Sequence, residues 1–418
     1  MRVSVNRSEI AGKVAAPPSK SYTIRGLMGA ALADGESVIL HPLTCDDTQA
    51  AHNVLTQVGV GVRREGDLWR VSGGNFHEPA TDLFCGDSAA TLRFMTAICA
   101  LVPGRCRLTA GASLSRRPVR PLVEALRQLG VNCTSRGGVA PVMVEGGRLR
   151  GGTAQLPGDV SSQFVSALLF IAPFAEEGVS IRLTTPLQSA SYVLMTIKCL
   201  GEFGIQVTQS GDRFDVSRQG YQPTKYAVEG DWSSASYLLA LGATSGEITV
   251  ENLNPDSLQG DRMMLNLLRG MGASVEVNNG AVTVRRAKLQ AITADLSACI
   301  DLLPTLAALA AVADGVSEFV GIERARIKES DRVAAVTEGL RRMGIRVAEE
   351  RDRLVITGGM PRGAVIDSHG DHRIAMAFSV LGSVAGDTII DGAECVTKTF
   401  PGFWDVMKTI GGGVKIDG

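Results

Sequence analysis

The sequence predicts an α/β protein made of two domains, each built from three similar repeats. A helical pattern closes six times with Leu or Met, two variable residues, an apolar residue and a glycine. After most of these glycines an alternating strand, a turn and a second strand follow. One such element cannot bury its apolar face alone, so several must pack together, and six fit two domains of three. The closing glycines are Gly59, Gly130, Gly204, Gly272, Gly344 and Gly411.

The fourth repeat shows the hairpin most plainly. Val275–Val277 and Val282–Val284 alternate apolar and polar residues on either side of a short polar segment. Asn279 and Gly280 within that segment favour a type I′ turn, because both residues tolerate a positive φ. The pattern predicts two antiparallel strands after each helix.

The division into domains follows from the repeat count. Three repeats per domain place the boundary between Gly204 and Gly272, where Gln219–Thr224 is the most linker-like segment. We therefore expect one domain over residues 17–226. The other would combine residues 1–16, which contain no such repeat, with residues 227–418. The chemistry is expected in a cleft between the two domains.

Composition excludes several classes of protein. A chain of 418 residues with 45% hydrophobic and 20% charged residues is typical of a globular protein with real cores. Its net charge of −1 argues against a nucleic-acid binder, so any anion must be recognised by local clusters. The eight cysteines show no metal-ligand spacing, which indicates reduced thiols.

The sequence also gives no sign of a membrane or export signal. Met1–Val5 alternates like a strand, without the pattern of a signal peptide. The longest apolar run, Leu302–Ala313, is interrupted by Pro304. We expect a monomeric cytoplasmic protein that contacts neither membranes nor nucleic acid.

The densest charged segment is Arg326–Arg332, where three cations and two carboxylates occupy seven residues. A helical pattern follows it and stops at Gly344, so either Ser330 or Asp331 is the N-cap. Free backbone N–H groups and the positive end of the helix dipole make such a place suitable for an anion. A solvated, well-capped helix start would give the same pattern.

The first half of the chain has two further helix entries of this kind. Pro17–Arg25 reads as a loop that opens a helix, with Ser19 or Ser21 as the cap and Lys20 beside it. The segment lacks the Walker pattern, so nucleotide hydrolysis is not expected. Gly86–Arg93 is a second entry rich in small residues, for which close helix packing is the alternative explanation.

Two more segments carry donors for anions. Ser113–Pro118 places two arginines just before a proline and a new helix. Gly158–Gln163 offers hydroxyl and amide groups at a helix start, where ordinary capping would also explain them.

The second half repeats this arrangement. Asp301 is a lone carboxylate in an apolar run, where it needs a partner or a function. Gly370–Met376 puts an acid, an imidazole and a guanidinium at a helix entry, although His372 alone is more often a packing residue than a catalyst. Lys398–Gly402 completes the set.

Taken together and in this order, the segments resemble the enolpyruvyl transferases, most closely those that act on shikimate 3-phosphate. The likeness covers essentially the whole chain. It is carried by Pro18–Ser21 with Arg25, Arg117–Pro118, Ser161–Gln163, Glu229–Asp231 with Ser233–Tyr237, Lys328–Arg332, Asp371–Arg373 and Lys398–Gly402.

The resemblance implies a fold, two substrates and a set of binding residues. The implied fold is a pair of inside-out α/β barrels, each of three β-α-β-α-β-β units, with the active site in the interdomain cleft. The residues implied to hold shikimate 3-phosphate are Lys20, Ser21, Arg25, Ser161, Ser162, Gln163, Ser189, Tyr192, Asp301 and Lys328. The residues implied to hold phosphoenolpyruvate are Lys20, Ala89, Arg117, Gln163, Arg332, Arg373 and Lys398.

The implied reaction adds the 5-hydroxyl of shikimate 3-phosphate to phosphoenolpyruvate through a tetrahedral intermediate and then expels phosphate. It needs a base, matched by Asp301, and a proton donor, matched by Glu329. Lys20, Lys328 and His372 are the implied helpers. The resemblance implies no metal and no organic cofactor.

The segment Gly86–Thr91 departs from the pattern of many relatives, which have Asn, Gly and Thr where this chain has Asp87, Ala89 and Ala90. An acid there would repel phosphoenolpyruvate unless it is neutralised as a helix cap or by Arg93. In this family the inhibitor glyphosate occupies the phosphoenolpyruvate site. The resemblance therefore implies that the methyl group of Ala89 crowds the inhibitor and makes this protein comparatively tolerant to it. The sister enzymes that act on a nucleotide-linked aminosugar fit less well, because Ser21 follows Lys20 and no cysteine lies beside Arg117.

Overall fold

The computed structural model describes residues 1–417, and the chain divides into two compact units. Unit A is Pro18–Glu229, and unit B is Met1–Pro17 together with the residues from Gly230 onward. The expected ranges, 17–226 for one domain and 1–16 with 227–418 for the other, differ from these units by one and three residues. Unit A ends three residues later than expected, at Glu229, because β14 (Lys225–Ala227) pairs in parallel with β3 (Gly35–Leu40) of this unit.

The segment that reads as a linker, Gln219–Thr224, lies inside unit A. Tyr221 is buried, and its hydroxyl donates a 2.6 Å hydrogen bond to the carbonyl of Phe170. Its ring also stacks on Phe174 at a centroid distance of 5.6 Å. A Pro/Gly-rich composition was therefore a poor marker of the boundary, because a single aromatic residue anchors the segment.

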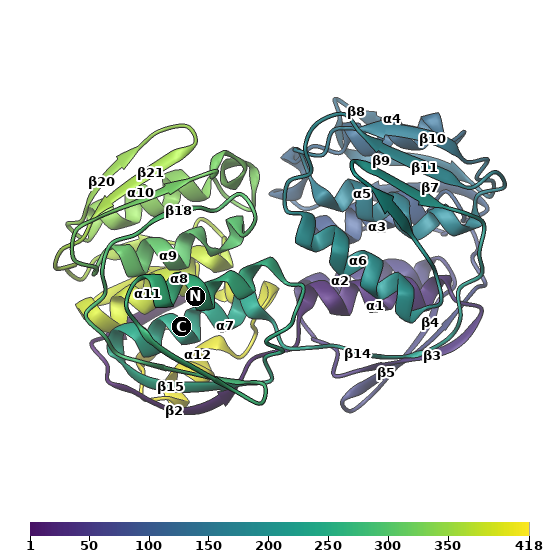
Figure 1. The fold of residues 1–418 in the computed structure, drawn as a ribbon. Coiled ribbons are helices and arrows are strands. Elements are labelled where there is room, and N and C mark those ends of the chain that lie inside the picture. Colours follow the sequence, from purple (N-terminus) through teal and green to yellow (C-terminus); the bar gives the residue numbers. More distant parts are fainter. Residues whose placement is uncertain (418) are drawn as a thin grey trace. The chain divides into compact units, whose positions relative to one another are not determined.

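The elements of unit A lie in the purple to teal part of Figure 1. Its helices are α1 (Lys20–Leu32), α2 (Asp46–Gln57), α3 (Ala89–Ile98), η1 (Leu114–Arg116), α4 (Arg120–Gln128), α5 (Ser162–Ile171), η2 (Ala172–Phe174) and α6 (Ala190–Glu202). Its strands are β3, β14, β4 (Gly61–Glu65), β5 (Leu68–Gly73), β6 (Leu83–Phe84), β7 (Gly104–Thr109), β8 (Asn132–Arg136), β9 (Val139–Gly146), β10 (Gly152–Leu156), β11 (Val179–Leu183), β12 (Thr208–Ser210) and β13 (Arg213–Val216).

Unit B contains the N-terminal strands and the second half of the chain. Its helices are α7 (Trp232–Ser245), η3 (Gly260–Met263), α8 (Met264–Gly270), η4 (Ile300–Leu302), α9 (Leu303–Ala310), η5 (Glu323–Ile327), α10 (Arg332–Arg342), α11 (His372–Ala385), η6 (Ala393–Lys398) and α12 (Phe403–Thr409). Its strands are β1 (Arg2–Asn6), β2 (Ile10–Ala15), β15 (Gly246–Glu251), β16 (Ser274–Asn278), β17 (Ala281–Arg285), β18 (Thr293–Asp295), β19 (Val316–Val320), β20 (Arg346–Glu349), β21 (Arg353–Thr357), β22 (Val365–Asp367), β23 (Thr388–Asp391) and β24 (Gly413–Asp417).

All six sheets share one topology, which confirms the predicted repeat. Each has four strands, with one parallel pair at an edge and two antiparallel pairings beyond it. In the third sheet of unit A, for example, β10 runs parallel to β11, and β13 pairs antiparallel with both β11 and β12. Two sheets of unit B are completed by the N-terminal segment, since β1 lies between β23 and β24 and β2 pairs with β15.

The six predicted helix ends are confirmed. Helices α2, α4, α6, α8, α10 and α12 each stop two residues before one of the six glycines, and each of those glycines has a positive φ between 81° and 104°. A positive φ ends a helix at low cost only where glycine supplies it. The predicted hairpin is also confirmed, because Asn279 and Gly280 have φ values of 44° and 79° between β16 and β17.

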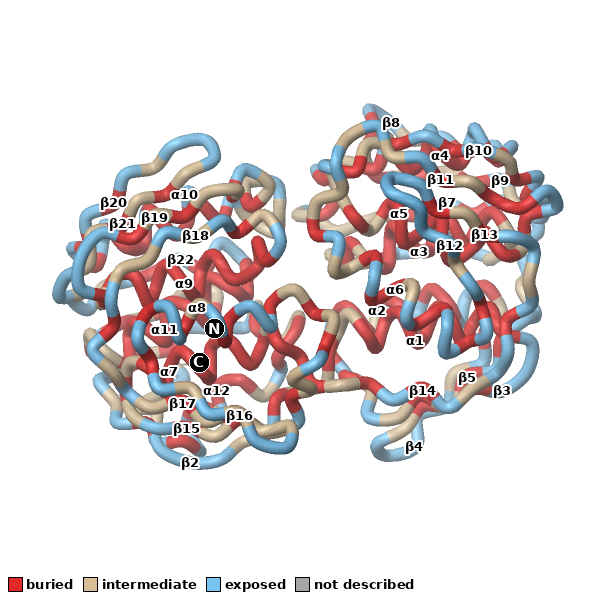
Figure 2. Tube along the Cα trace, viewed as in Figure 1, coloured by how far each residue is buried: buried red, intermediate tan, exposed pale blue. Residues whose placement is uncertain are grey.

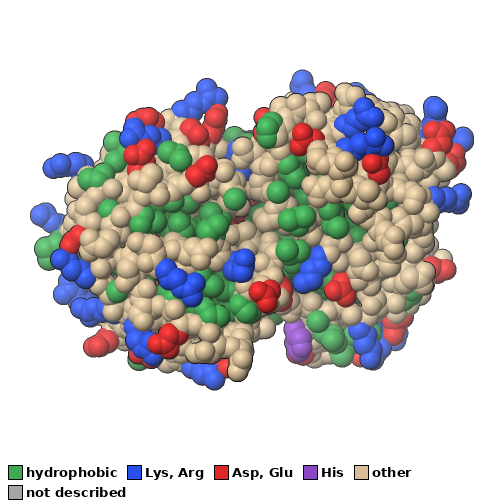
Figure 3. Space-filling model, in the orientation of Figure 1, with side chains coloured by type: hydrophobic (Ala, Val, Ile, Leu, Met, Phe, Trp, Pro, Cys, Tyr) green, Lys and Arg blue, Asp and Glu red, His purple; other side chains and the backbone are tan. Residues whose placement is uncertain are grey.

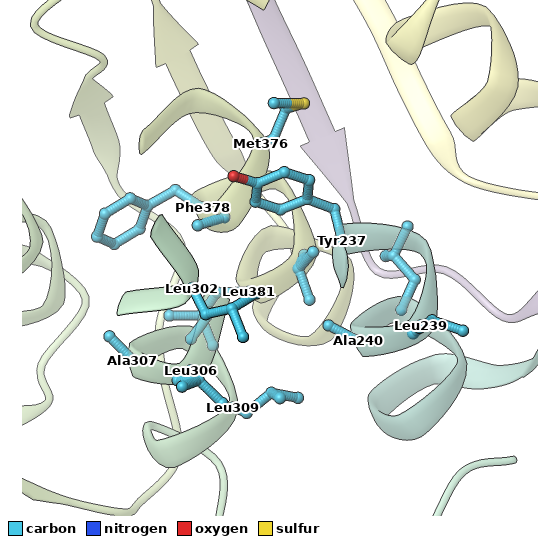
Figure 4. Close-up of a cluster of buried hydrophobic side chains, with 14 of the residues drawn as sticks. Tyr237, Leu239, Ala240, Leu302, Leu306, Ala307, Leu309, Met376, Phe378 and Leu381 are labelled. Carbon is cyan, nitrogen blue, oxygen red and sulfur yellow. The ribbon is translucent and has the colours of Figure 1, made fainter. Parts of the chain in front are cut away.

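The odd-numbered helices carry the cores and explain the inside-out arrangement. In unit B, α7, α9 and α11 pack on one another through buried apolar side chains such as Tyr237, Leu306 and Phe378 (Figure 4). Within each unit the helices are buried and the sheets lie toward the outside, as Figure 2 shows. Helices buried on all sides show no single apolar stripe, because apolar and small residues occur all around them.

The outer faces of the sheets carry paired charges. Arg70 on β5 contacts Glu36 and Glu65, and Arg285 on β17 contacts Glu247 and Glu276. On the face in Figure 3, cationic and anionic side chains alternate around the rim of each unit. No helix within residues 1–417 is both long and apolar enough to cross a bilayer.

Candidate active site

Most of the predicted site residues lie at or next to helix N-termini, whereas Arg25 lies in the second turn of α1 and Lys398 is the last residue of η6. In each repeat a helix connects parallel strands, so it runs antiparallel to them, and its N-terminus lies at the carboxyl ends of those strands. Backbone N–H groups and dipoles of several helices thus point the same way within a unit. The fold therefore gathers the predicted residues into one end of each unit.

The N-caps settle the alternatives that the sequence left open. Ser19 caps α1 by accepting from the N–H of Tyr22, and Asp331 caps α10 by accepting from the N–H of Ala334 at 3.0 Å. Ser161 caps α5, and Asp371 caps α11. Each cap fixes where the following side chain points, because the helix starts at the next residue.

A cluster of charged side chains in unit B centres on Arg332. Its guanidinium is 1% exposed and donates to three carboxylates that come from three different segments. The donor to acceptor distances are 2.7 Å to Asp301, 2.6 Å to Glu329 and 2.8 Å to Asp371. Burial alone would lower the pKa of Arg332, but the three carboxylates stabilise the charged guanidinium by more than burial destabilises it, so this pKa is raised. We define Asp301, Lys328, Glu329, Arg332, Asp371, Arg373 and Lys398 as the charge cluster.

The remaining cations of the charge cluster approach the same carboxylates. Lys328 Nζ lies 3.3 Å from Asp301 Oδ1, and Arg373 Nη2 lies 3.5 Å from Asp301 Oδ2. Lys398 Nζ lies 3.9 Å from Glu329 Oε1. Burial alone would raise the pKa of Asp301, but Lys328, Arg373 and Arg332 outweigh it and hold that pKa well below its usual range. Asp301 is therefore an anion in the free protein.

His372 is the first residue of α11 and is 1% exposed. Its Nδ1 lies 3.6 Å from Asp371 Oδ1, which in turn accepts from the backbone N–H of Arg373. The imidazole thus lies next to Asp371, one of the carboxylates of the charge cluster. This position fits both the predicted helper role and the alternative of a packing residue.

Unit B also contains a buried acid that the sequence analysis missed. Asp261 in η3 is 3% exposed and accepts a short hydrogen bond from the hydroxyl of Ser233 on α7. Burial and the nearby charge of Asp301 raise the pKa of Asp261 to about 7, against the opposing effect of Arg373. Its sequence signal was weak, because a Gly-Asp-Arg segment is common at the start of an ordinary helix.

In unit A, Arg93 joins two of the predicted segments. Its Nη1 donates to Ser161 Oγ at 3.1 Å and to Gln163 Oε1 at 2.8 Å, and its Nη2 donates to the carbonyl of Pro118 at 3.3 Å. Ser162 follows as the first, buried residue of α5. Arg93 thereby fixes the start of α5 beside the segment that carries Arg117. From the sequence, Arg93 was expected only as a partner that would neutralise Asp87.

Arg25 contacts two other predicted residues, Ser21 and Tyr192. It is 2% exposed and donates to the backbone carbonyls of Ser21 and Tyr192, both at 3.0 Å, and to Thr196 at 2.9 Å. Ser189, the N-cap residue of α6, has φ 52° and ψ 47°. A serine in this left-handed region costs about 1–3 kcal/mol, and such strain is concentrated at functional sites.

Three further predicted residues lie at helix ends. Lys20 opens α1, and its Nζ lies 2.9 Å from the buried carboxylate of Asp47. Ala89 opens α3 and is 7% exposed. Arg117 follows η1 and is 9% exposed. Asp47 was missed as a site residue, although its position at the start of a helix was visible in the sequence.

The structure shows how the acid at position 87 is accommodated. Asp87 Oδ1 accepts from the N–H of Leu114 at 2.9 Å, and the cap of α3 is Ser88 rather than Asp87. Asp87 therefore braces the turn that leads to Arg117.

The fold and these groups define an α/β protein that buries cations and carboxylates together at helix starts. A family profile described as EPSP synthase (3-phosphoshikimate 1-carboxyvinyltransferase) matches residues 5–407. The chain is 50% identical to the 3-phosphoshikimate 1-carboxyvinyltransferase of Dehalococcoides mccartyi, over 100% of both chains. It is 40% identical to the enzyme of that name from Methanocaldococcus jannaschii, over 97% of both chains. The chain belongs to the EPSP synthase family.

Solved structures agree with this assignment. The EPSP synthase of Acinetobacter baumannii has a TM-score of 0.85 at 27% identity, covering 99% of this chain and 100% of that chain. The enolpyruvyl transferase NikO of Streptomyces tendae shares the fold, with a TM-score of 0.81 at 16% identity over 99% and 98% of the two chains. The expected fold class and family are confirmed.

Proposed function

We propose that this chain transfers the enolpyruvyl group of phosphoenolpyruvate to the 5-hydroxyl of shikimate 3-phosphate and releases phosphate, with the charge cluster as its reacting centre. Membership in the EPSP synthase family supports the reaction. The single structural observation that carries the proposal is the placement of Asp301 and Glu329 on one buried guanidinium, that of Arg332. The proposed base and the proposed proton donor would thus share one rigid support.

Asp301 is the proposed base for the 5-hydroxyl. Its carboxylate is ionised in the free protein, but the same cations that keep it ionised also make it a weak base. An anionic substrate that pairs with Lys328 or Arg373 would weaken the stabilisation that these cations give to the Asp301 carboxylate. The basicity of Asp301 would then rise. Substrate binding therefore prepares the base for its task.

Glu329 is the proposed acid for the methylene carbon of phosphoenolpyruvate. Its carboxylate contacts Arg332 and lies 3.9 Å from Lys398. In the addition step the O–H bond of the 5-hydroxyl breaks toward Asp301, the new C–O bond forms, and the methylene carbon takes the proton held by Glu329. In the elimination step the C–O bond to phosphate breaks, the phosphate takes the proton that Asp301 had accepted, and the methyl group returns one proton to Glu329.

The binding roles follow the charges. Shikimate 3-phosphate is assigned to two sets of residues. In unit A they are Lys20, Ser21, Arg25, Ser161, Ser162, Gln163, Ser189 and Tyr192, and in unit B they are Asp301 and Lys328. Phosphoenolpyruvate is assigned to Lys20, Arg117, Arg332, Arg373 and Lys398, with Ala89 and Gln163 beside it. Guanidinium groups suit carboxylates and phosphates because two parallel N–H groups meet two oxygens.

A monomer in the cytoplasm completes the proposal. The eight cysteines have free thiols, seven of them buried, as is usual in a reducing compartment. A monomer would sediment with a mass of 44.0 kDa.

Phosphate release tests the proposal directly. Phosphate is expected when shikimate 3-phosphate and phosphoenolpyruvate are both present in buffer with a chelator, and not with either substrate alone. Release from phosphoenolpyruvate alone would contradict it. Transfer to a nucleotide-linked aminosugar instead of shikimate 3-phosphate would also contradict it.

A further inference from the structure

Two charged residues of the segment Arg326–Arg332 have no role in the proposed reaction. Lys328, Glu329 and Arg332 belong to the charge cluster, whereas Arg326 and Asp331 do not. Arg326 lies near the end of η5, and Asp331 is the N-cap of α10. Lys328 and Glu329 therefore lie between these two residues in the chain.

The guanidinium of Arg326 contacts both Asp331 and the loop between β20 and β21. Its Nη1 lies 3.2 Å from Asp331 Oδ2 and 2.8 Å from Glu349 Oε1 at the end of β20. Its Nε donates to the carbonyl of Arg351 at 3.0 Å, and its Nη2 donates to the carbonyl of Glu350 at 2.6 Å. All three guanidinium nitrogens are thus used.

These contacts are partly shielded from water and include two ion pairs. The side chain of Arg326 is 21% exposed, and those of Glu349 and Asp331 are 25% and 41% exposed. Hydrogen bonds between ionised groups are stronger than neutral ones, and a planar guanidinium fixes their directions. Lysine, with a single ammonium group, cannot reproduce contacts in four directions.

The two ends of the reactive segment are thereby joined to each other. Arg326 and Asp331 are five residues apart, and their ion pair closes the short loop that carries Lys328 and Glu329. Closing a short loop removes most of its alternative conformations. A proton donor must lie within hydrogen-bond reach of its target, so small displacements of such a loop slow the reaction.

We propose that Arg326 is a positioning residue that holds Lys328 and Glu329 in place through Asp331 and the β20–β21 hairpin. This inference rests on the proposed function. It predicts that Arg326 acts on the rate of the chemical step rather than on substrate affinity, because the residue touches none of the assigned binding groups.

The test compares Arg326→Gln with a matched control, Arg351→Gln. Arg351 lies in the same hairpin and pairs with Glu323 of the same η5 helix, but it is 84% exposed and has no contact with Asp331. In phosphate-release assays we expect Arg326→Gln to lower kcat at least about 10-fold, with the KM of both substrates within about twofold of the wild type. Arg351→Gln should leave kcat unchanged.

Two further variants extend the test, and Asp331→Asn alone keeps it decisive if Arg326→Gln folds poorly, because it should also lower kcat with both KM values nearly unchanged. Arg326→Lys keeps the positive charge but not the planar guanidinium with its three nitrogen donors, so its kcat should lie between those of the wild type and Arg326→Gln. Asp331→Asn keeps a good N-cap while removing the ion pair. Combined with Arg326→Gln it should cost less than the sum of the two single effects.

The outcomes separate this inference from the proposed function. A wild-type protein that releases no phosphate would reject the proposed function itself. With an active wild type, the positioning role is rejected if folded Arg326→Gln keeps more than half of the wild-type kcat. It is also rejected if Arg351→Gln loses as much kcat as Arg326→Gln.

Discussion

The two units differ in the charges they bury. Among residues 1–417, the buried charged side chains of unit A are one carboxylate, Asp47, and three arginines, Arg25, Arg93 and Arg117. Unit B buries two arginines, Arg332 and Arg373, and four carboxylates. Those carboxylates are Asp231, Asp261, Asp301 and Asp371. The same repeat therefore buries mostly cationic side chains in unit A and mostly carboxylates in unit B.

This difference suggests a division of labour. The buried side chains of unit A carry more positive than negative charge, and an anionic ligand would offset that excess. Unit A is thus suited to recognise anions by charge and by neutral donors. Unit B pairs its cations with acids that can accept or hold protons, so it is suited to proton transfer. Substitutions in the two units should accordingly affect different kinetic constants.

The largest effect is expected in unit B. Glu329→Gln removes the proposed proton donor but keeps a side chain that can hydrogen-bond to Arg332. We expect kcat to fall by about 10² to 10⁴-fold, with KM values nearly unchanged. Steady-state phosphate release measures both constants, and Glu323→Gln on η5 is the control. A raised KM at unchanged kcat would make Glu329 a binding residue and would remove the contrast between the units.

In unit A, Arg117→Ala should affect affinity instead. It removes charge-assisted hydrogen bonds of about 1.5–3 kcal/mol, so phosphoenolpyruvate should bind about 10- to 150-fold more weakly. The turnover at saturation should change little. Titration of phosphoenolpyruvate gives the affinity, and Arg116→Ala, at the exposed neighbouring position, is the control. Slower turnover with intact affinity would contradict the assignment.

Asp261→Asn tests the acid-rich interior of unit B through stability. The folded pKa of about 7 lies above the unfolded value near 3.8, so between these values the folded protein holds a proton that the unfolded chain has lost. The wild type should therefore lose stability as the pH rises from about 4 to 7, by up to about 1.4 kcal/mol per pH unit.

The Asp261→Asn variant lacks this proton and should lose less stability over that range. Urea unfolding of both proteins at pH 5 and pH 8 gives the comparison. We expect the stability difference between variant and wild type to shift in favour of the variant by about 2 kcal/mol at the higher pH. An equal shift for both proteins would show that Asp261 titrates normally.

The smallest effect is expected for a neutral donor of unit A. Ser162→Ala removes one hydroxyl at the start of α5 without removing the N-cap, which is Ser161. The loss of one neutral hydrogen bond, about 0.5–1.5 kcal/mol, should raise the KM for shikimate 3-phosphate about 2- to 12-fold. The kcat should be unaffected. A change in kcat alone would place Ser162 in the chemical step.

Most of the fold could be predicted because each repeat ends a helix at a glycine with a positive φ. That local requirement is visible in the sequence, as at Gly344 and Gly411. The first helix of each repeat was harder to delimit, because α7 and α11 are buried on all sides and show no periodicity. The boundary near residue 229 could not be predicted, because it depends on the pairing of β14 with a distant strand.

The site was predicted as residue types at helix starts, but not as contacts. Nothing in the sequence shows that Arg332 contacts Asp301, Glu329 and Asp371 at once, since those contacts require three segments to meet. Asp47, Arg93 and Asp261 were missed for the same reason. Their roles depend on partners 27 to 70 residues away in the chain.

The pairing of β1 and β2 has a consequence for biosynthesis. These strands leave the ribosome first, yet β2 must wait for β15, and β1 must wait for β23 and β24 near the other end of the chain. Every sheet of unit A, in contrast, is complete once Ala227 has emerged. Because domains fold as units during synthesis, unit A should be folded while the N-terminal strands are still unpaired edges. A nascent chain halted before β15 would then carry a finished unit A together with unpaired N-terminal strands and the uncovered helix α7, a natural target for a chaperone.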